Sequence, residues 1–552
     1  MDAQYGPPLD EFLRSKDFDL SQRAAPTREE IRQAIHLLSD PQKVSCSTFE
    51  TILAMEYSPS CAHLGLLISG GGVFPACMSL LRRYCHVERK GLLDSAYGFL
   101  CLQVMALSVQ VGILSQTNQL KDFLLDASSQ PKSESIFAIL STRIAQLEAR
   151  ALGGSQDHGV VWLLGWHQDE TTGRLTCLPR IGGCTILDAK FLIERMYLAR
   201  GDLLNAAKWA AVIFPGWVAA RPRDVNVSAF NRILNQKIYH QSLGPDQQQC
   251  WTHFADIGYR YALCSGETED RLLPSMLMYC PGFARPWRTL EPKTALNDLD
   301  SKQIVEAFSK KLQSHPGTHI AFVAMLLGYI CANFGESDFD KGIAQALQAN
   351  SRRLWIEVLK VHQLNLEQWG DLTTHVGSIF SVLVILFKKY PKHTMSLLRI
   401  AVSSDFLELL GRLLLSPLLL VGTFGSSLAS RFMEDSGPSA LLGSMAKFAL
   451  MLKQSSAAKS FKPDELMVSA WRKTDQALGR IASSSNNKPP LAKSYASSSA
   501  RAWLALGMAL GLDKYSGNVR VARPKFTAAH GASDWTGWAR EVHIRPNAWL
   551  WR

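Results

Sequence analysis

Cysteine is sparse in this sequence and shows no metal-binding spacing. The chain has 11 cysteines among 552 residues, and none of them forms a Cys-x-x-Cys pair. This usage excludes a disulfide-stapled secreted scaffold and favours a reducing compartment, so we expect a cytoplasmic or nuclear protein. The nearest approach to a ligand cluster, Cys61-x-His63 with Cys77, lacks the close-spaced pairs of structural zinc. We therefore expect no metal site and interpret Cys61, Cys77 and Cys101 as small core residues.

Local signatures of catalysis are also missing. The sequence has no Gly-x-Ser-x-Gly elbow and no His-Glu-x-x-His helix. Ser-x-x-Lys occurs at Ser456 and at Ser129 without a downstream Lys-Thr-Gly, which indicates chance. The glycine run 70–72 is followed by no lysine, so it predicts a turn between helices and not a phosphate cradle. We expect no catalytic residue and no cofactor.

Long apolar runs of membrane-spanning type are missing too. The acidic start of the chain, with Asp10 and Glu11, predicts no signal peptide. The apolar stretches 319–334 and 376–387 are shorter than the roughly 20 residues of a spanning helix, and 407–428 is interrupted by charges and a proline. Buried helices explain all three, so we expect no stable membrane insertion.

The excess of positive charge belongs to one end of the chain. Of the formal net charge of +11, residues 437–552 account for all, whereas residues 1–436 have 42 basic and 42 acidic groups. A neutral body argues against a nucleic-acid surface spread over the fold, but the basic end suits phosphate, acidic protein or anionic lipid. The simpler interpretation of this end is a solvated segment that keeps the protein soluble.

Tryptophan and arginine are mixed in the final stretch. Such a segment suits stacking on single-stranded bases while the cations meet phosphates. A membrane interface, a groove on a partner, or an exon or reading-frame error are the alternatives. The candidate contact residues are Arg520, Arg523, Lys525, Trp535, Trp538, Arg540, Arg545, Trp549 and Trp551.

What the sequence does contain is a long series of short helices. The 47% of hydrophobic residues, with 19% charged, indicates enough apolar surface for a folded core. Thr27 with Glu30 predicts a capping box at the start of a helix over 26–38. A further helix is expected to begin at 47–50, and others are expected near 61–69, 73–84, 92–100, 104–115, 188–200, 203–214, 228–240, 247–263, 463–482 and 500–510. The fold class is therefore mostly all-α.

One segment breaks the helical pattern. Strand-like residues on both sides of Glu170–Gly173 predict a β-hairpin over 159–179. Serine runs near 455–458, 483–485 and 497–499 are typical of linkers.

These features suggest a division into five regions. They are an N-terminal arm (1–24), a helical armadillo-like region (25–150), a helical region with the β-hairpin 159–179 and Pro/Trp-rich loops (151–300), a helical region (301–453), and a basic Ser-rich linker with a Trp/Arg-rich tail (454–552).

Two stretches resemble armadillo or HEAT repeats, in which one helix ends at glycine and the next opens with a paired leucine. They are Leu64–Leu81 and Met395–Leu415, and the resemblance covers about 25–130 and 300–455. It implies an armadillo-like or irregular α-solenoid, with a non-repetitive helical fold as the alternative. The texture is also similar to that of fungal proteins that end in a MYND-type zinc finger, but this chain has no cysteine after Cys331.

Binding is the function that these observations favour. Helical arrays expose extended faces suited to proteins, so we expect a protein–protein interaction scaffold or adaptor without catalysis. The first alternative is association with nucleic acid through residues 437–552. The second alternative is an enzyme whose site is assembled from distant residues, with His167, His240, His253 and Glu194 as candidates.

Overall fold

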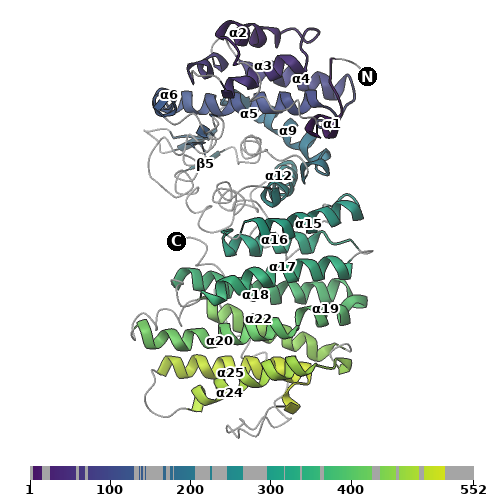
Figure 1. Cartoon of the computed structure of the whole chain (residues 1–552), viewed down its shortest axis with the longest axis vertical. Helices are drawn as coiled ribbons and strands as arrows, with labels where there is room; N and C mark the ends of the chain where they lie inside the picture. The colour runs from purple at the N-terminus through teal and green to yellow at the C-terminus, as the bar shows by residue number, and fades with distance from the viewer. Residues whose placement is uncertain are drawn as a thin grey trace. The chain divides into compact units, whose positions relative to one another are not determined.

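The computed structural model divides the chain into two units, residues 1–284 and 285–552 (Figure 1). The structure describes residues 4–14, 25–57, 61–68, 72–129, 136, 139–140, 143–144, 166–168, 174–177, 180–204, 224–226, 245–264, 295–315, 317–335, 339–360, 366–424, 436–455, 459–483 and 490–515. In these ranges the protein is mostly α-helical with a few short strands, as the sequence predicts.

Unit 1 contains helices and every strand of the described residues. Its α-helices are α1 (Leu9–Arg14), α2 (Arg28–Leu37), α3 (Cys46–Leu53), α4 (Val73–His86), α5 (Ala96–Gln116), α6 (Leu120–Ser129), α9 (Ile186–Leu198) and α12 (Pro245–Cys264). Its 3₁₀ helices are η3 (Ala54–Tyr57), η4 (Cys61–Leu67) and η5 (Asp202–Leu204). Its strands are β1 (Trp166–Gln168), β2 (Arg174–Cys177), β3 (Arg180–Ile181), β4 (Cys184–Thr185) and β5 (Asp224–Asn226).

The core of unit 1 surrounds α5. This helix is apolar on every side, and it contacts α1, α3, α4, α6 and η4. The prediction of two helices, 92–100 and 104–115, is wrong because no proline, glycine or capping residue between 100 and 104 ends a helix. Cys101 is buried on α5 and donates to the Cys77 carbonyl on α4 at 3.6 Å, in line with the interpretation of both as core residues.

Local start signals operate as expected in unit 1. Thr27 is the N-cap of α2, and its hydroxyl accepts the Glu30 N–H at 3.2 Å. The Glu30 carboxylate in turn accepts the Thr27 N–H at 2.7 Å, so the predicted capping box is confirmed.

The strands form two small antiparallel sheets. In the predicted hairpin, β1 pairs with β2, with His167 opposite Thr176, and β5 adds a third strand that the sequence did not predict. A second hairpin, β3–β4, turns at Gly182 and Gly183, both with positive φ. A Cβ on Gly112 of α5 would lie 2.7 Å from the Gly182 Cα, so only glycine allows this turn to approach α5.

Unit 2 contains only helices in its described part. They are α15 (Asp298–Ser314), α16 (Ile320–Ala332), α17 (Phe339–Leu359), α18 (Leu366–Lys389), η9 (Pro391–His393), α19 (Thr394–Ala401), α20 (Ser404–Phe424), α22 (Ser436–Gln454), α24 (Glu465–Ser483), α25 (Pro490–Leu510) and η10 (Asp513–Tyr515).

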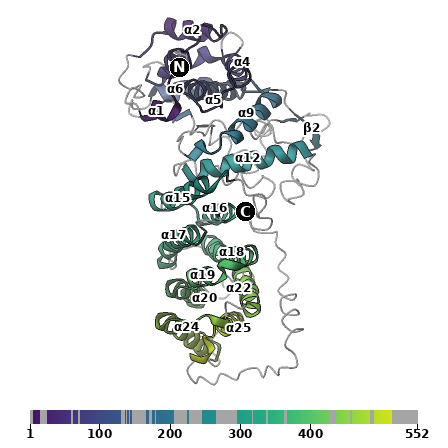
Figure 2. The same ribbon diagram turned by 90° about the vertical axis from the view of Figure 1, so that its right-hand side faces the viewer.

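The helices of unit 2 pack in two rows (Figure 2). In the first row α15 contacts α17, α17 contacts α20 and α20 contacts α24. In the second row α16 contacts α18, α18 contacts α22 and α22 contacts α25. Gly377 lets α18 approach α22 closely, because a Cβ there would lie 3.3 Å from the Leu441 Cα. The first-row helices begin at residues 298, 339, 404 and 465, so no constant interval separates them.

Helices α24 and α25 belong to these rows. They pack on α20, α22 and each other, and they confirm the helices predicted at 463–482 and 500–510. The serine run 497–499 lies inside α25, and Ser499 is fully buried. Small hydroxyl side chains suit a crowded helix interface as well as a linker, which is why composition alone misplaced them.

Two described helices, α5 and residues Gln368–Lys389 of α18, are long and apolar enough to cross a membrane by length and composition. Both are mostly buried by neighbouring helices of their own units, which is also typical of core helices.

Candidate functional site

The residues predicted to contact a partner through the tail lie outside the described residues. This holds for all nine positions from Arg520 to Trp551 and for His240. His167 lies on β1, where only the backbone is described. Glu194 and His253 are the two members of the hypothetical enzyme site whose surroundings the structure describes.

Glu194 and His253 lie on the neighbouring helices α9 and α12. The His253 ring stacks on Tyr197, with ring centroids 3.7 Å apart, and the Arg200 guanidinium lies 4.0 Å from the Tyr197 ring centroid. Burial is the main cause that lowers the pKa of His253; Arg200 lowers it further, whereas the nearby acids raise it. The ring thus has an aromatic and cationic environment that holds two helices together.

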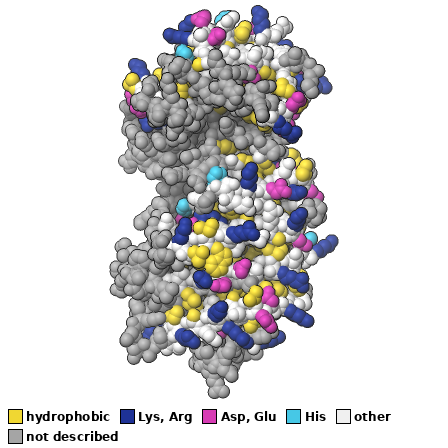
Figure 3. Space-filling model, in the orientation of Figure 1, with side chains coloured by type: hydrophobic (Ala, Val, Ile, Leu, Met, Phe, Trp, Pro, Cys, Tyr) yellow, Lys and Arg dark blue, Asp and Glu magenta, His cyan; other side chains and the backbone are white. Residues whose placement is uncertain are grey.

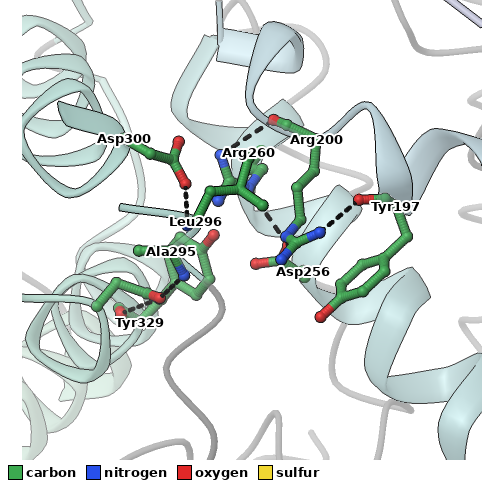
Figure 4. Close-up of polar contacts among 9 residues, drawn as sticks. Tyr197, Arg200, Asp256, Arg260, Ala295, Leu296, Asp300 and Tyr329 are labelled. Carbon is green, nitrogen blue, oxygen red and sulfur yellow. Dashed lines mark hydrogen bonds and ion pairs between the residues drawn. The ribbon is translucent and has the colours of Figure 1, made fainter. Parts of the chain in front are cut away.

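A buried ion cluster lies beside this stack (Figure 4). Asp256 and Arg260, one turn apart on α12, are almost completely buried and 3.3 Å apart. Arg200 approaches the same Asp256 oxygen at 3.6 Å, and Arg260 donates to the Arg200 carbonyl at 3.0 Å. Both guanidinium groups approach the Asp256 carboxylate, and Arg260 also binds a backbone carbonyl. The cluster therefore links the end of α9 to α12, which is a structural role.

Unit 2 has a buried polar cluster of its own between α17 and α18. The His375 Nε2 lies 2.9 Å from the Asn350 Oδ1, and both side chains are buried. The His375 Nδ1 has no hydrogen-bond partner. Burial, with a smaller effect of Arg353, lowers the pKa of His375 from 6.5 to about 3. The imidazole is therefore neutral at physiological pH.

Arg353 in the same cluster joins two segments. It donates to Glu357 one turn along α17 at 2.5 Å and to the Thr318 carbonyl before α16 at 3.1 Å. Asn333 accepts a hydrogen bond from the Ala295 N–H at 2.7 Å, ahead of α15, and donates to the Tyr329 carbonyl at 3.0 Å; Figure 4 labels Ala295 and Tyr329. These contacts fix the beginnings of α15 and α16 onto the rows.

The interface of α24 with α25 contains two stacked indoles. Trp471 and Trp503 are fully buried, with ring centroids 4.7 Å apart and planes 6° apart. Their Nε1 atoms have no hydrogen-bond partner in the described part of the chain, and the buried Ser499 hydroxyl interacts with Tyr495. A Cβ on Gly507 would lie 2.1 Å from the Trp471 ring, so glycine makes room for the stack.

The exposed face of the first row has balanced charge. In Figure 3 basic, acidic and apolar side chains alternate over unit 2. On α20, Arg412 pairs with Glu408 at 2.8 Å and lies 5.2 Å from the Trp355 ring centroid of α17. On α15, Lys302 approaches Glu306 at 3.8 Å.

The exposed face of the second row differs. Ser444, Lys447 and Leu450 of α22 lie on one face of the helix because they are three residues apart. The same spacing recurs on α25, where the residues are Ser498, Arg501 and Leu504. We call these two sets, together with Met508, the second-row stripe; Lys447, Leu450, Arg501 and Met508 are exposed.

Comparison of the chain with protein-family models, curated proteins and solved structures found no match. Within the described ranges no group of three or more His, Cys, Asp or Glu side chains is arranged to hold a metal ion. The mostly helical structure is compatible with a helical-repeat fold.

Sequence reasoning missed the second-row stripe. The sequence signal for the stripe is the pattern Ser-x-x-basic-x-x-Leu, which occurs at 444–450 and at 498–504. The pattern was overlooked because the serine-rich composition of 497–499 was interpreted as a linker.

Proposed function

We propose that unit 2 is an irregular armadillo- or HEAT-like α-solenoid that serves as a scaffold for protein partners. The two rows support this proposal, because each helix packs against the helix before and after it in its own row. In such an array the outer faces of both rows do not contribute to the core, so their side chains can bind a partner. The recurrence of Ser-x-x-basic-x-x-Leu on α22 and α25 also fits a repeated unit.

Capture of partners by the full-length protein tests the scaffold. Tagged wild-type protein is compared with a second-row variant, Lys447→Glu with Arg501→Glu, and a first-row variant, Arg352→Glu with Lys473→Glu, each with and without nuclease. All four side chains are exposed, so the variants are expected to fold. A set of nuclease-resistant proteins that one variant loses supports the scaffold. Capture that is the same for all three proteins, or that nuclease abolishes, counts against it.

A second candidate function is association with nucleic acid, and the charge of residues 437–552 favours it. It predicts binding that weakens steeply with salt. Because α22, α24 and α25 are part of the rows, the deletion that tests it must begin after residue 515 and not at 437. Unchanged binding of an oligonucleotide after this deletion would rule out residues 516–552 as its site.

A further inference from the structure

The two parts of the second-row stripe lie on helices that pack against each other. The serine hydroxyls of Ser381 on α18 and Ser444 on α22 lie 3.5 Å apart, so the stripe begins where α22 meets α18. Helices α18, α22 and α25 follow one another in the second row, and α25 repeats the α22 pattern. On each of these adjacent helices, serine, cation and aliphatic side chain therefore follow one another at intervals of three residues.

The charge of these two helices has one sign. Helices α22 and α25 contain four basic residues, Lys447, Lys453, Lys493 and Arg501, and no acidic residue. Within the described residues none of the four pairs with a carboxylate, and Arg501 donates only to the Ser497 carbonyl at 3.4 Å. The first-row face, where cations pair with Glu306 and Glu408, lacks this excess. Unpaired cations of one sign on a face favour an anionic partner.

Apolar side chains lie among these cations. Leu450 is 44% exposed and lies about one helical turn after Lys447. Met508 is 51% exposed and lies about two turns after Arg501. A phosphate backbone gains nothing from aliphatic side chains, whereas a peptide can cover them. The aromatic residues of the two helices, Phe448, Tyr495 and Trp503, are buried and offer no ring on which bases stack.

We propose that the second-row stripe binds an acidic peptide segment with aliphatic side chains. Its carboxylates pair with Lys447 and Arg501, and its aliphatic groups cover Leu450 and Met508. This inference rests on the proposed scaffold function and names the chemistry of its partner.

The test uses fluorescence anisotropy with the full-length protein. The probe is a labelled peptide of glutamates with leucines one helical turn apart, and two control peptides replace glutamate by glutamine or leucine by serine. The protein variants are Lys447→Glu with Arg501→Glu and, as the matched control on the other row, Arg352→Glu with Lys473→Glu. A labelled single-stranded oligonucleotide is the competing probe.

We expect the acidic peptide to bind more tightly than both control peptides and more weakly as salt rises. The second-row variant should lose about tenfold in affinity and the first-row variant less than about twofold. Equal binding of the glutamine peptide, or equal loss in both variants, overturns the proposal. The proposal is also overturned if the oligonucleotide binds more tightly than the peptide and its binding depends on Lys447 and Arg501 in the same way. The partner of the stripe would then be nucleic acid.

The outcome separates this inference from the scaffold itself. If cellular partners are captured and lost in the first-row variant while the acidic peptide does not bind, the second-row stripe is not the binding face and the scaffold stands. If no variant changes the captured set, the scaffold fails whatever the peptide does.

Discussion

Acidification should destabilise unit 2 through His375. Its imidazole is fully buried and neutral, with a pKa lowered from 6.5 to about 3 by burial and by Arg353. In the unfolded chain the same ring has a pKa near 6.5. Between these two values the unfolded state binds a proton that the folded state does not, so stability falls as the pH falls from about 6.5 towards 3.

The size of the effect follows from the width of this pH window. Each pH unit below the unfolded pKa costs about 1.4 kcal/mol, so the loss at about pH 5 is roughly 2 kcal/mol relative to neutral pH. Above pH 7 the group contributes no pH dependence. His375→Gln removes the titrating ring but keeps a donor for the Asn350 Oδ1.

Urea unfolding of the full chain, followed by tryptophan fluorescence at about pH 7.5 and pH 5, measures this difference. The wild type should lose about 2 kcal/mol more than His375→Gln between the two pH values. Ser378→Ala, on the next turn of α18, is the matched control and should keep the wild-type pH dependence. If wild type and His375→Gln lose the same free energy, His375 does not enter the fold as a neutral buried ring.

Three further substitutions test packing and buried polarity by the same unfolding assay. Gly112→Ala places a methyl group against the backbone of the β3–β4 turn and should lower the free energy of unfolding by about 1–3 kcal/mol. The control is Gly370→Ala, which has open space around it and should raise the free energy of unfolding by about 0.5–1 kcal/mol. Ser499→Ala removes a fully buried hydroxyl that interacts with the Tyr495 hydroxyl and should cost about 1 kcal/mol, while the less buried Ser498→Ala should change little; a gain of stability at Ser499 would mean that the two hydroxyls form no hydrogen bond. Asp256→Asn removes the buried carboxylate on which Arg200 and Arg260 converge and should cost about 3–5 kcal/mol; a neutral result would mean that water reaches this cluster.

Much of the local structure could be predicted from sequence because its causes are local. The Thr27–Glu30 capping box needs only residues three positions apart, and the structure has it. The hairpin of β1 and β2 follows from two short strand-like runs around a glycine turn. The mostly α-helical class follows in the same way from many short amphipathic segments.

The candidate binding face depended on contacts between distant segments. Ser499 is buried in α25, which packs on both α22 and α24, although its serine run has the composition of a linker.

What the sequence by itself determined is where helices begin, which class of fold they build and which end of the chain is basic. These properties depend on residues close together in the chain or on their sum. Only the tertiary structure decided that α5 is one helix, that His375 is buried beside Arg353, and that Lys447 and Arg501 lie on adjacent helices. Burial and the juxtaposition of charges are set by packing between segments far apart in sequence, and no local pattern encodes them.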